Sequence, residues 1–311
     1  MHPEFHAVGD YLSRQWPVDL SRRVFDTNSL RIRQSTPSGS RFNRGFLVYR
    51  CRVEQNEREF YGSSFGAAAV EYDEHRPDYA QAAVRWALEP APGVRVLDLG
   101  AGTGKLTTAL VEMGAEVIAV EPDPAMLSEL RRALPTVRAL AGKAESVPLP
   151  DGSVDAVVAG NALHWFNMNV AGPEIARVLV PGGILAGLWN IFDDRVDWVA
   201  QLGRVGGRWA IGSRDTLSRW RAETSQAHLP GDGQVFHFES PEQAEFPHGQ
   251  RRTVDSLVAT FATKAGVLVM QEEEREVTLD RIRMFLASRS ETALGEFTVP
   301  MLTGVLRARR L

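Results

Sequence analysis

Short apolar runs alternate with segments of helical periodicity through the middle of the chain. The run 94–99 is apolar except for Arg95 and Asp98, which is typical of a buried parallel strand. From 106 to 113, apolar residues recur three and four positions apart, as on one face of a helix. Further strands are predicted at 116–121, 136–141, 154–159 and 184–189, with helices at 124–134 and 174–179. This order of elements predicts an α/β fold with a doubly wound, mostly parallel sheet.

The segments on either side of this core have weaker patterns. A helix over 82–88 ends at the Pro-Ala-Pro-Gly turn that precedes the first strand. Beyond 191, helices are predicted over 197–208 and 214–228, from Thr253 as an N-cap, and over 278–287, and strand-like alternation is present at 236–238, 244–246 and 296–305. We therefore expect one folded domain over 59–311.

Residues 1–58 differ from the rest of the chain. They mix Arg, Ser, Pro and Gly with isolated aromatic residues and show no sustained period. Arg22-Arg23 resembles the start of a twin-arginine export signal, but no apolar segment follows it, so targeting is rejected. The segment is interpreted as a disordered extension; a partner-binding arm and non-native sequence upstream of the true start are the alternatives.

Composition narrows the possible functions. A formal charge of −4 gives no general argument for binding nucleic acid or an anionic membrane. The single cysteine, Cys51, excludes an intramolecular disulfide and a cysteine-based zinc site, and the histidines have no metal-ligand spacing. No apolar run reaches the ~20 residues of a membrane span. We expect a cytoplasmic protein without a metal or a membrane partner.

The candidate chemistry begins where the first strand ends, in the sequence D-x-G-x-G-x-G from Asp98 to Gly104. Strand, glycine turn and helix form a ligand-binding turn, because glycine lets the backbone approach a ligand closely. A dinucleotide site would need glycine at 105, where this chain has Lys105, and a phosphate-binding P-loop would need glycine at 99, where it has Leu99.

This motif resembles the first motif of the class I S-adenosylmethionine-dependent methyltransferases. The resemblance implies a Rossmann-like fold and places Asp98, Gly100, Ala101, Gly102 and Gly104 at the cofactor S-adenosyl-L-methionine. A glycine-rich turn of another α/β enzyme is the alternative.

The end of the second strand carries a further candidate for cofactor binding. Glu121, followed by Pro122, stands where a carboxylate accepts hydrogen bonds from both ribose hydroxyls. A solvated loop carboxylate is the alternative reading of Glu121.

The segment 65–79 has the pattern F-x-x-x-A-x-x-Y-x-x-x-R-P-x-Y, which is similar to one methyltransferase subgroup that includes the trans-aconitate and ubiquinone-biosynthesis types. The resemblance implies that Tyr72 and Arg76 lie over the methionine carboxylate of the cofactor, a group that suits the planar donors of arginine. Alternatively, Tyr72 belongs to the core and Arg76 to a surface ion pair.

Two further segments extend the resemblance. The family commonly has an acid where this chain has Lys143, and lysine cannot accept a hydrogen bond from the adenine amino group. The backbone of Ala144 and the side chain of Glu145 are therefore carried over, with helix capping as the alternative for Glu145. In 160–166, Asn161 is expected to line the cofactor and His164 to lie near the transferred methyl group.

The resemblance also implies the reaction. Methyl transfer from a sulfonium needs orientation and exclusion of water, and no metal. His164 is the candidate general base, unless it only packs against Trp165 or the acceptor is a carboxylate, which needs no base. The family places a substrate-covering helical lid at about 197–228, where Trp198, Trp209 and Trp220 are pocket or core residues.

We expect methyl transfer to a small organic acceptor at oxygen. The alternatives are a macromolecular acceptor, with nucleic acid disfavoured by charge, and a non-catalytic cofactor-binding regulator.

Overall fold

The computed structural model describes residues 64–212, 214–224 and 238–311, all within the compact unit Leu47–Leu311. The extension predicted at 1–58 lies outside the described residues, as do Cys51 and most of the strand predicted at 236–238. The predicted boundaries of the extension and the folded domain stay predictions.

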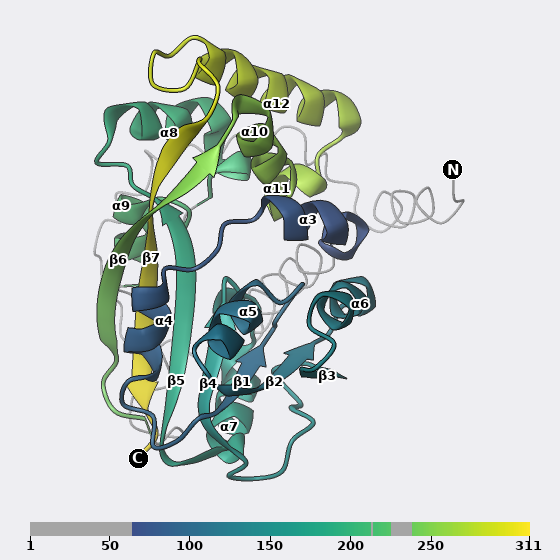
Figure 1. Ribbon diagram of the computed structural model, residues 1–311, viewed down its shortest axis with the longest axis vertical. Coiled ribbons are helices and arrows are strands. Elements are labelled where there is room, and N and C mark those ends of the chain that lie inside the picture. Colours follow the sequence, from purple (N-terminus) through teal and green to yellow (C-terminus); the bar gives the residue numbers. More distant parts are fainter. Residues whose placement is uncertain (1–63, 213, 225–237) are drawn as a thin grey trace, which may run out of the picture. The chain divides into compact units, whose positions relative to one another are not determined.

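A seven-stranded sheet with the order β3-β2-β1-β4-β5-β7-β6 lies at the centre of the described chain (Figure 1). Its strands are β1 (Arg95–Leu99), β2 (Glu116–Glu121), β3 (Arg138–Ala141), β4 (Val154–Gly160), β5 (Leu179–Phe192), β6 (Glu242–Arg252) and β7 (Phe297–Arg309). The first five strands pair in parallel, and β7 pairs antiparallel with both β5 and β6. The α/β fold and the mostly parallel sheet predicted from the sequence are therefore confirmed.

Helices cover both faces of this sheet. The described helices are α3 (Ala69–His75), α4 (Gln81–Leu88), α5 (Lys105–Glu112), α6 (Pro124–Ala133), α7 (Met168–Val178), α8 (Asp197–Ala210), α9 (Leu217–Thr224), α10 (Val254–Ala262), α11 (Ala265–Leu268) and α12 (Glu272–Ala287). Side chains of α4 and α5 pack with Val96 and Val158 on one face, and those of α7 and α9 pack with Leu97 and Val157 on the other. Alternate residues of one strand thus serve two cores, which explains why β1 and β4 are apolar almost throughout.

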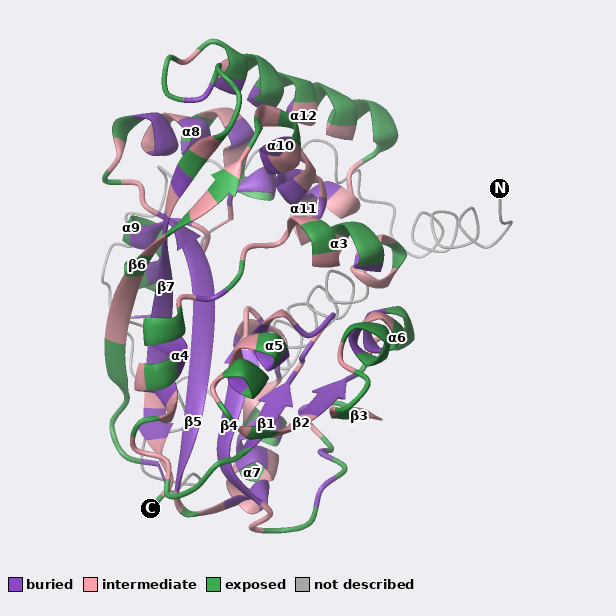
Figure 2. Cartoon of the chain, viewed as in Figure 1, coloured by how far each residue is buried: buried purple, intermediate pink, exposed green. Residues whose placement is uncertain are grey.

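A second hydrophobic core joins helices from two separate parts of the sequence. Side chains of α8, α10, α11 and α12 pack with Phe192 of β5 and Met301 of β7, beyond the carboxyl end of the parallel strands (Figure 1). In α12, Ile282 is buried in this core and Met284 is 73% exposed. Figure 2 shows that much of the outer side of α12 is exposed. This helical cluster, defined by 197–210 and 254–287, covers more of the sequence than the lid predicted at 197–228.

The predicted lid segment also divides in two. Trp198 of α8 is buried in the helical cluster, and Trp209 is 41% exposed. Trp220 of α9 instead packs on the sheet, where a Cβ on Gly304 would lie 2.6 Å from its ring. The part of the predicted helix beyond Thr224 lies outside the described residues.

Some predicted boundaries differ from the observed ones. The segment 181–183, predicted as a turn, lies within β5, with Gly182 at a φ of +76°. The helix predicted over 278–287 begins at Glu272, because three glutamates at its start extend the helix without adding to its apolar pattern. Both N-caps are confirmed: Asp123 accepts from the backbone of α6, and Thr253 forms a capping box with Ser256.

Within the described ranges, no helix is long and apolar enough to cross a membrane. In the same part of the chain, no group of three or more His, Cys, Asp or Glu side chains is placed to hold a metal ion.

Candidate active site

The glycine turn after β1 has the backbone that its sequence requires. Gly100, Gly102 and Gly104 have φ values of +71°, +59° and +96°. At Gly102 an added Cβ would meet no atom within 4 Å, so the space beside the turn is open. Glycine is favoured at this position by its backbone conformation and not by lack of space. At Gly100 an added Cβ would lie 2.8 Å from the Cβ of Ala162, which shows how closely the loop after β4 approaches.

Glu121 joins the end of β2 to this turn. Its Oε2 accepts a hydrogen bond from the Gly102 amide and its Oε1 accepts one from the Asp123 amide, both at 2.8 Å. Its side chain is nearly buried, and burial raises the pKa of the carboxyl while the two amides oppose that shift. Each carboxylate oxygen retains a second lone pair for a further donor. The next residue, Pro122, is exposed.

Asp98 is fully buried at the end of β1. Its Oδ2 accepts from the Thr107 hydroxyl at 2.6 Å, whereas its Oδ1 has no hydrogen-bond partner in the described part of the chain. Burial raises the pKa of this carboxyl to about 7. Because an unpartnered buried oxygen is costly, its retention points to a ligand that supplies the missing donor.

The end of β4 is strained. Asn161 is the one described residue other than glycine with a positive φ, +50°. Its Nδ2 donates to the Tyr79 hydroxyl at 3.1 Å and its Oδ1 accepts from the Asn190 amide at 3.3 Å. Burial raises the pKa of the Tyr79 hydroxyl. The sequence analysis assigned no role to this tyrosine, although it is the last residue of the 65–79 pattern. The network fixes the loop after β4 against the segment between α3 and α4.

The side chains of Tyr72 and Arg76 lie together. The Arg76 guanidinium stacks over the Tyr72 ring, 4.6 Å from its centroid. Its Nε donates to the Thr263 hydroxyl at 2.9 Å and its Nη2 donates to the Thr263 carbonyl at 2.8 Å. Arg76 thus connects the end of α3 to the helical cluster, a contact that the sequence did not indicate. Contact with a cofactor carboxylate stays a prediction.

The segment after β3 places its candidate residues in different environments. Ala144 is buried and Lys143 is exposed. The Oε1 atom of Glu145 accepts from the amide of Asn167, the N-cap residue of α7, at 2.8 Å. This contact favours the capping alternative for Glu145 over a contact with adenine.

His164 lies in the 3₁₀ turn after Asn161. Its Nδ1 accepts from Trp189 Nε1 at 3.3 Å, and its ring packs on Trp165 with centroids 4.6 Å apart. Because the indole nitrogen only donates, Nδ1 carries no proton in this bond and the ring proton lies on Nε2. This geometry favours an orienting role, and the role of general base stays a prediction.

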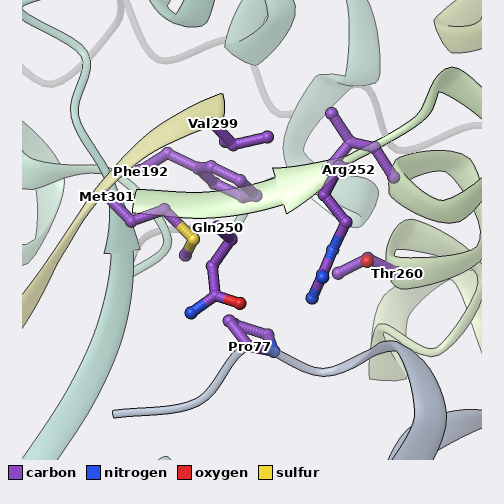
Figure 3. Close-up of a pocket in the computed structure, with 8 residues that line it drawn as sticks. Pro77, Phe192, Gln250, Arg252, Thr260, Val299 and Met301 are labelled. Atoms are coloured by element: carbon purple, nitrogen blue, oxygen red, sulfur yellow. The ribbon is translucent and has the colours of Figure 1, made fainter. Parts of the chain in front are cut away.

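A small pocket lies beside the segment that joins α3 and α4 (Figure 3). Its residues come from that segment, β5, β6, β7 and α10: Pro77, Phe192, Gln250, Arg252, Leu257, Thr260, Val299 and Met301. Gln250 and Arg252 extend from β6 toward the side of Pro77 (Figure 3). The Arg252 Nη2 donates to the His75 carbonyl at 3.1 Å, which fixes this side chain at the pocket wall.

The fold and the turn together define a Rossmann-like cofactor-dependent enzyme. Its candidate cofactor-binding elements meet at the carboxyl ends of the parallel strands, where such sheets bind ligands. Strand β1 carries the buried Asp98 and leads into the open turn at Gly102. The adjacent strand β2 ends in Glu121.

Comparisons with known proteins agree with this class. A family model described as a methyltransferase domain matches residues 97–187. An uncharacterized methyltransferase of Mycobacterium tuberculosis is 42% identical over 246 residues, which cover 79% of this chain and 95% of that protein. A malonyl-acyl-carrier-protein O-methyltransferase of Methylococcus capsulatus is 39% identical over 142 residues, 42% of this chain and 51% of that protein. The solved structure of a type II methyltransferase from Anaeromyxobacter dehalogenans is 27% identical, with a TM-score of 0.54, and covers 76% of this chain and 97% of that one.

The chain therefore belongs to the class I S-adenosylmethionine-dependent methyltransferases. The family and the enzyme class predicted from the glycine motif are confirmed. The resemblance to the trans-aconitate and ubiquinone-biosynthesis subgroup stays a prediction.

Proposed function

We propose that this methyltransferase binds S-adenosyl-L-methionine along the carboxyl ends of β1, β2 and β4 and methylates a small organic acceptor at oxygen. The observation that carries the proposal is the buried Oδ1 of Asp98, which has no hydrogen-bond partner within the described ranges, together with the open turn at Gly102. A ligand with a positively charged N–H donor satisfies that oxygen, and the ammonium group of the cofactor is such a donor.

The other residues fit the rest of the cofactor. Glu121 would accept from the ribose hydroxyls with the lone pairs that Gly102 and Asp123 leave available. Ala144, nearly buried beyond β3, would contact the adenine ring through its backbone. Arg76 would hold the methionine carboxylate, with Tyr72 keeping the guanidinium in place.

When bound, S-adenosyl-L-methionine supplies a methyl group activated by a sulfonium. The protein's own contribution is orientation and exclusion of water, which suits a site between the strand ends and the helical cluster. Asn161 and Tyr79 hold the β4 loop in one strained conformation, so the acceptor approaches from a fixed direction. With its Nδ1 accepting from Trp189, His164 would orient the acceptor, and no base is needed if the acceptor is a carboxylate.

The choice of oxygen and of a small acceptor rests on two supports. The relative from Methylococcus capsulatus is named an O-methyltransferase, and the 65–79 pattern is similar to a subgroup with a carboxylate acceptor. That relative's name also favours a second candidate, an acceptor carried on a protein. The cytoplasmic location predicted from the sequence stays a prediction.

Two measurements test the proposal. Calorimetry with S-adenosylhomocysteine tests the cofactor site, and labelled S-adenosylmethionine with a metabolite mixture, read by mass, tests the acceptor. We expect cofactor binding and at least one small methylated product that carries the label on oxygen. Cofactor binding with methylation of protein alone would favour the second candidate. Binding without any methyl transfer would favour a regulatory role, and absence of cofactor binding would refute the proposal.

A further inference from the structure

The Tyr79 hydroxyl is a buried hydrogen-bond donor for which the described residues supply no acceptor. Tyr79 is 8% exposed, and its hydroxyl oxygen accepts from the Nδ2 of Asn161 at 3.1 Å. The Oδ1 of Asn161 is fixed as an acceptor, because the backbone amide of Asn190 donates to it. Asn161 therefore presents a donor to Tyr79, and the phenolic proton is left to be donated to another group.

The end of β4 is shaped around this hydroxyl. A Cβ on Gly160, the last residue of β4, would lie 2.5 Å from the hydroxyl oxygen of Tyr79, so a larger residue does not fit there. The next residue, Asn161, holds its donor in place at a positive φ of +50°, a costly conformation for a residue other than glycine. Burial raises the pKa of the Tyr79 hydroxyl, so the group remains a neutral donor at physiological pH.

The backbone on both sides of Tyr79 is held by a pair of polar residues in the sheet. Asn190 of β5 and Thr303 of β7 are buried and lie opposite each other, and the Thr303 hydroxyl donates to the Oδ1 of Asn190 at 2.9 Å. The Nδ2 of Asn190 donates to the Pro77 carbonyl at 3.0 Å. The Thr303 hydroxyl accepts from the Ala80 amide at 3.0 Å. Because a satisfied buried network fixes one arrangement, this pair determines where the tyrosine lies.

Tyr79 and Asp98 lie over the same face of two adjacent strands. Asp98 of β1 pairs with Val158 of β4, and Gly160 is two residues further along β4. Because side chains alternate along a strand, these three positions share one face, and Tyr79 packs on Gly160 from that side. Within the described ranges, the Oδ1 of Asp98 has no donor and the Tyr79 hydroxyl has no acceptor. No recorded hydrogen bond joins the two groups, so a ligand with both a donor and an acceptor would complete them.

We propose that Tyr79 is a further cofactor-binding residue, whose hydroxyl donates a hydrogen bond to the carboxylate of S-adenosyl-L-methionine, with Asn190 and Thr303 as positioning residues. The amino-acid end of the cofactor carries an ammonium group for Asp98 and a carboxylate for Tyr79 on the same carbon atom. Arg76, which the proposed function assigns to the same carboxylate, is three residues from Tyr79 in the chain. This inference rests on the proposed function, because it assumes that the cofactor binds at the ends of β1 and β4.

S-adenosylhomocysteine and its decarboxylated analogue test this inference, because they differ only in the carboxylate. Binding of each to the full-length protein is measured by calorimetry. Tyr79→Phe is expected to weaken S-adenosylhomocysteine about tenfold or more, as for loss of a hydrogen bond to a charged group. The same variant is expected to bind the decarboxylated analogue as the wild type does.

Variants of Thr303 test the positioning role. Thr303→Val removes the hydroxyl that the Ala80 amide and Asn190 share, and is expected to weaken S-adenosylhomocysteine more than the analogue. Thr303→Ser keeps the hydroxyl and is expected to restore the wild-type preference. Thr224→Val is the matched control, because it removes a buried threonine hydroxyl that bonds only within α9, and it is expected to change neither affinity.

Each contrary result has a defined meaning. Equal weakening of both ligands by Tyr79→Phe would assign the hydroxyl a structural role and overturn the inference. Unchanged binding of S-adenosylhomocysteine in that variant would also overturn it. A Thr303→Ser variant that binds like Thr303→Val would refute the positioning role. Failure of the wild type to bind S-adenosylhomocysteine refutes the proposed function instead.

Discussion

Replacement of Asp98 by asparagine is expected to stabilise the cofactor-free protein above neutral pH while it weakens cofactor binding. Asp98 is fully buried; its Oδ2 accepts from the Thr107 hydroxyl, and its Oδ1 has no hydrogen-bond partner among the residues that the structure describes. An asparagine keeps an acceptor for Thr107 and carries no charge. The substitution therefore isolates the cost of holding a carboxyl in this position.

The size of this effect on the free energy of unfolding follows from the pKa of Asp98. The folded protein holds the Asp98 carboxyl at a pKa of about 7, against 3.8 for the unperturbed group. Between these values the native state binds more protons than the unfolded state, so the free energy of unfolding falls as pH rises, by about 1.4 kcal/mol per pH unit. Over the whole interval the loss is about 4 kcal/mol.

Asparagine avoids this loss but introduces a different one. Its amide nitrogen takes the place of the unpartnered oxygen, and a buried donor without an acceptor costs about 1–3 kcal/mol at every pH. The variant is therefore expected to be less stable than the wild type near pH 4 and more stable, by about 1–3 kcal/mol, above pH 7.

Urea unfolding of both proteins, free of cofactor and at several pH values from about 5 to 8, measures this difference. Asp155→Asn is the matched control, because Asp155 is buried in the adjacent strand but its pKa is lowered by Arg95. That variant is expected to lose stability relative to the wild type above pH 4, the opposite sign. A difference between Asp98→Asn and the wild type that does not change with pH would refute the reasoning.

The remaining predictions concern binding and catalysis. The affinity for S-adenosylmethionine is expected to rise with pH up to about 7, as Asp98 ionises beside the ligand's ammonium group, and a flat calorimetric profile would contradict this. Glu121→Ala is expected to weaken S-adenosylhomocysteine binding by about 1.5–3 kcal/mol, the range for hydrogen bonds to a charged group; unchanged affinity in a folded variant would exclude the ribose role. His164→Gln is expected to change kcat little if the acceptor is a carboxylate, whereas a ~10²–10⁴-fold fall that depends on pH would identify a general base.

The parallel core and the glycine turn could be predicted because their causes are local. A strand buried on both faces is apolar at nearly every position, and β1 and β4 satisfy this directly. The positive φ angles at Gly100 and Gly102 belong to single residues, so the sequence marks them without reference to the rest of the fold. Asp123 as an N-cap is local in the same sense.

The rest of the site depends on contacts between distant segments. Arg76 reaches Thr263 across 187 residues, and Asn161 reaches Tyr79 across 82. No period or spacing records such pairs, because each partner has an ordinary local sequence. The sequence predicts too small a helical cluster for the same reason: the apolar face of α12 packs with α8, which lies far from it in the sequence, as well as with the nearby α10.

Two costly arrangements lie at the carboxyl ends of adjacent parallel strands. Asp98 of β1 has a buried oxygen without a hydrogen-bond partner among the described residues, and Asn161, which follows β4, has a strained backbone. Each arrangement costs stability. Since proteins retain such costs chiefly where a ligand offsets them, their position at the carboxyl ends of β1 and β4 supports a binding site there. The ammonium group of the cofactor would satisfy the acid, so S-adenosylhomocysteine, which carries the same group, is expected to stabilise the folded protein.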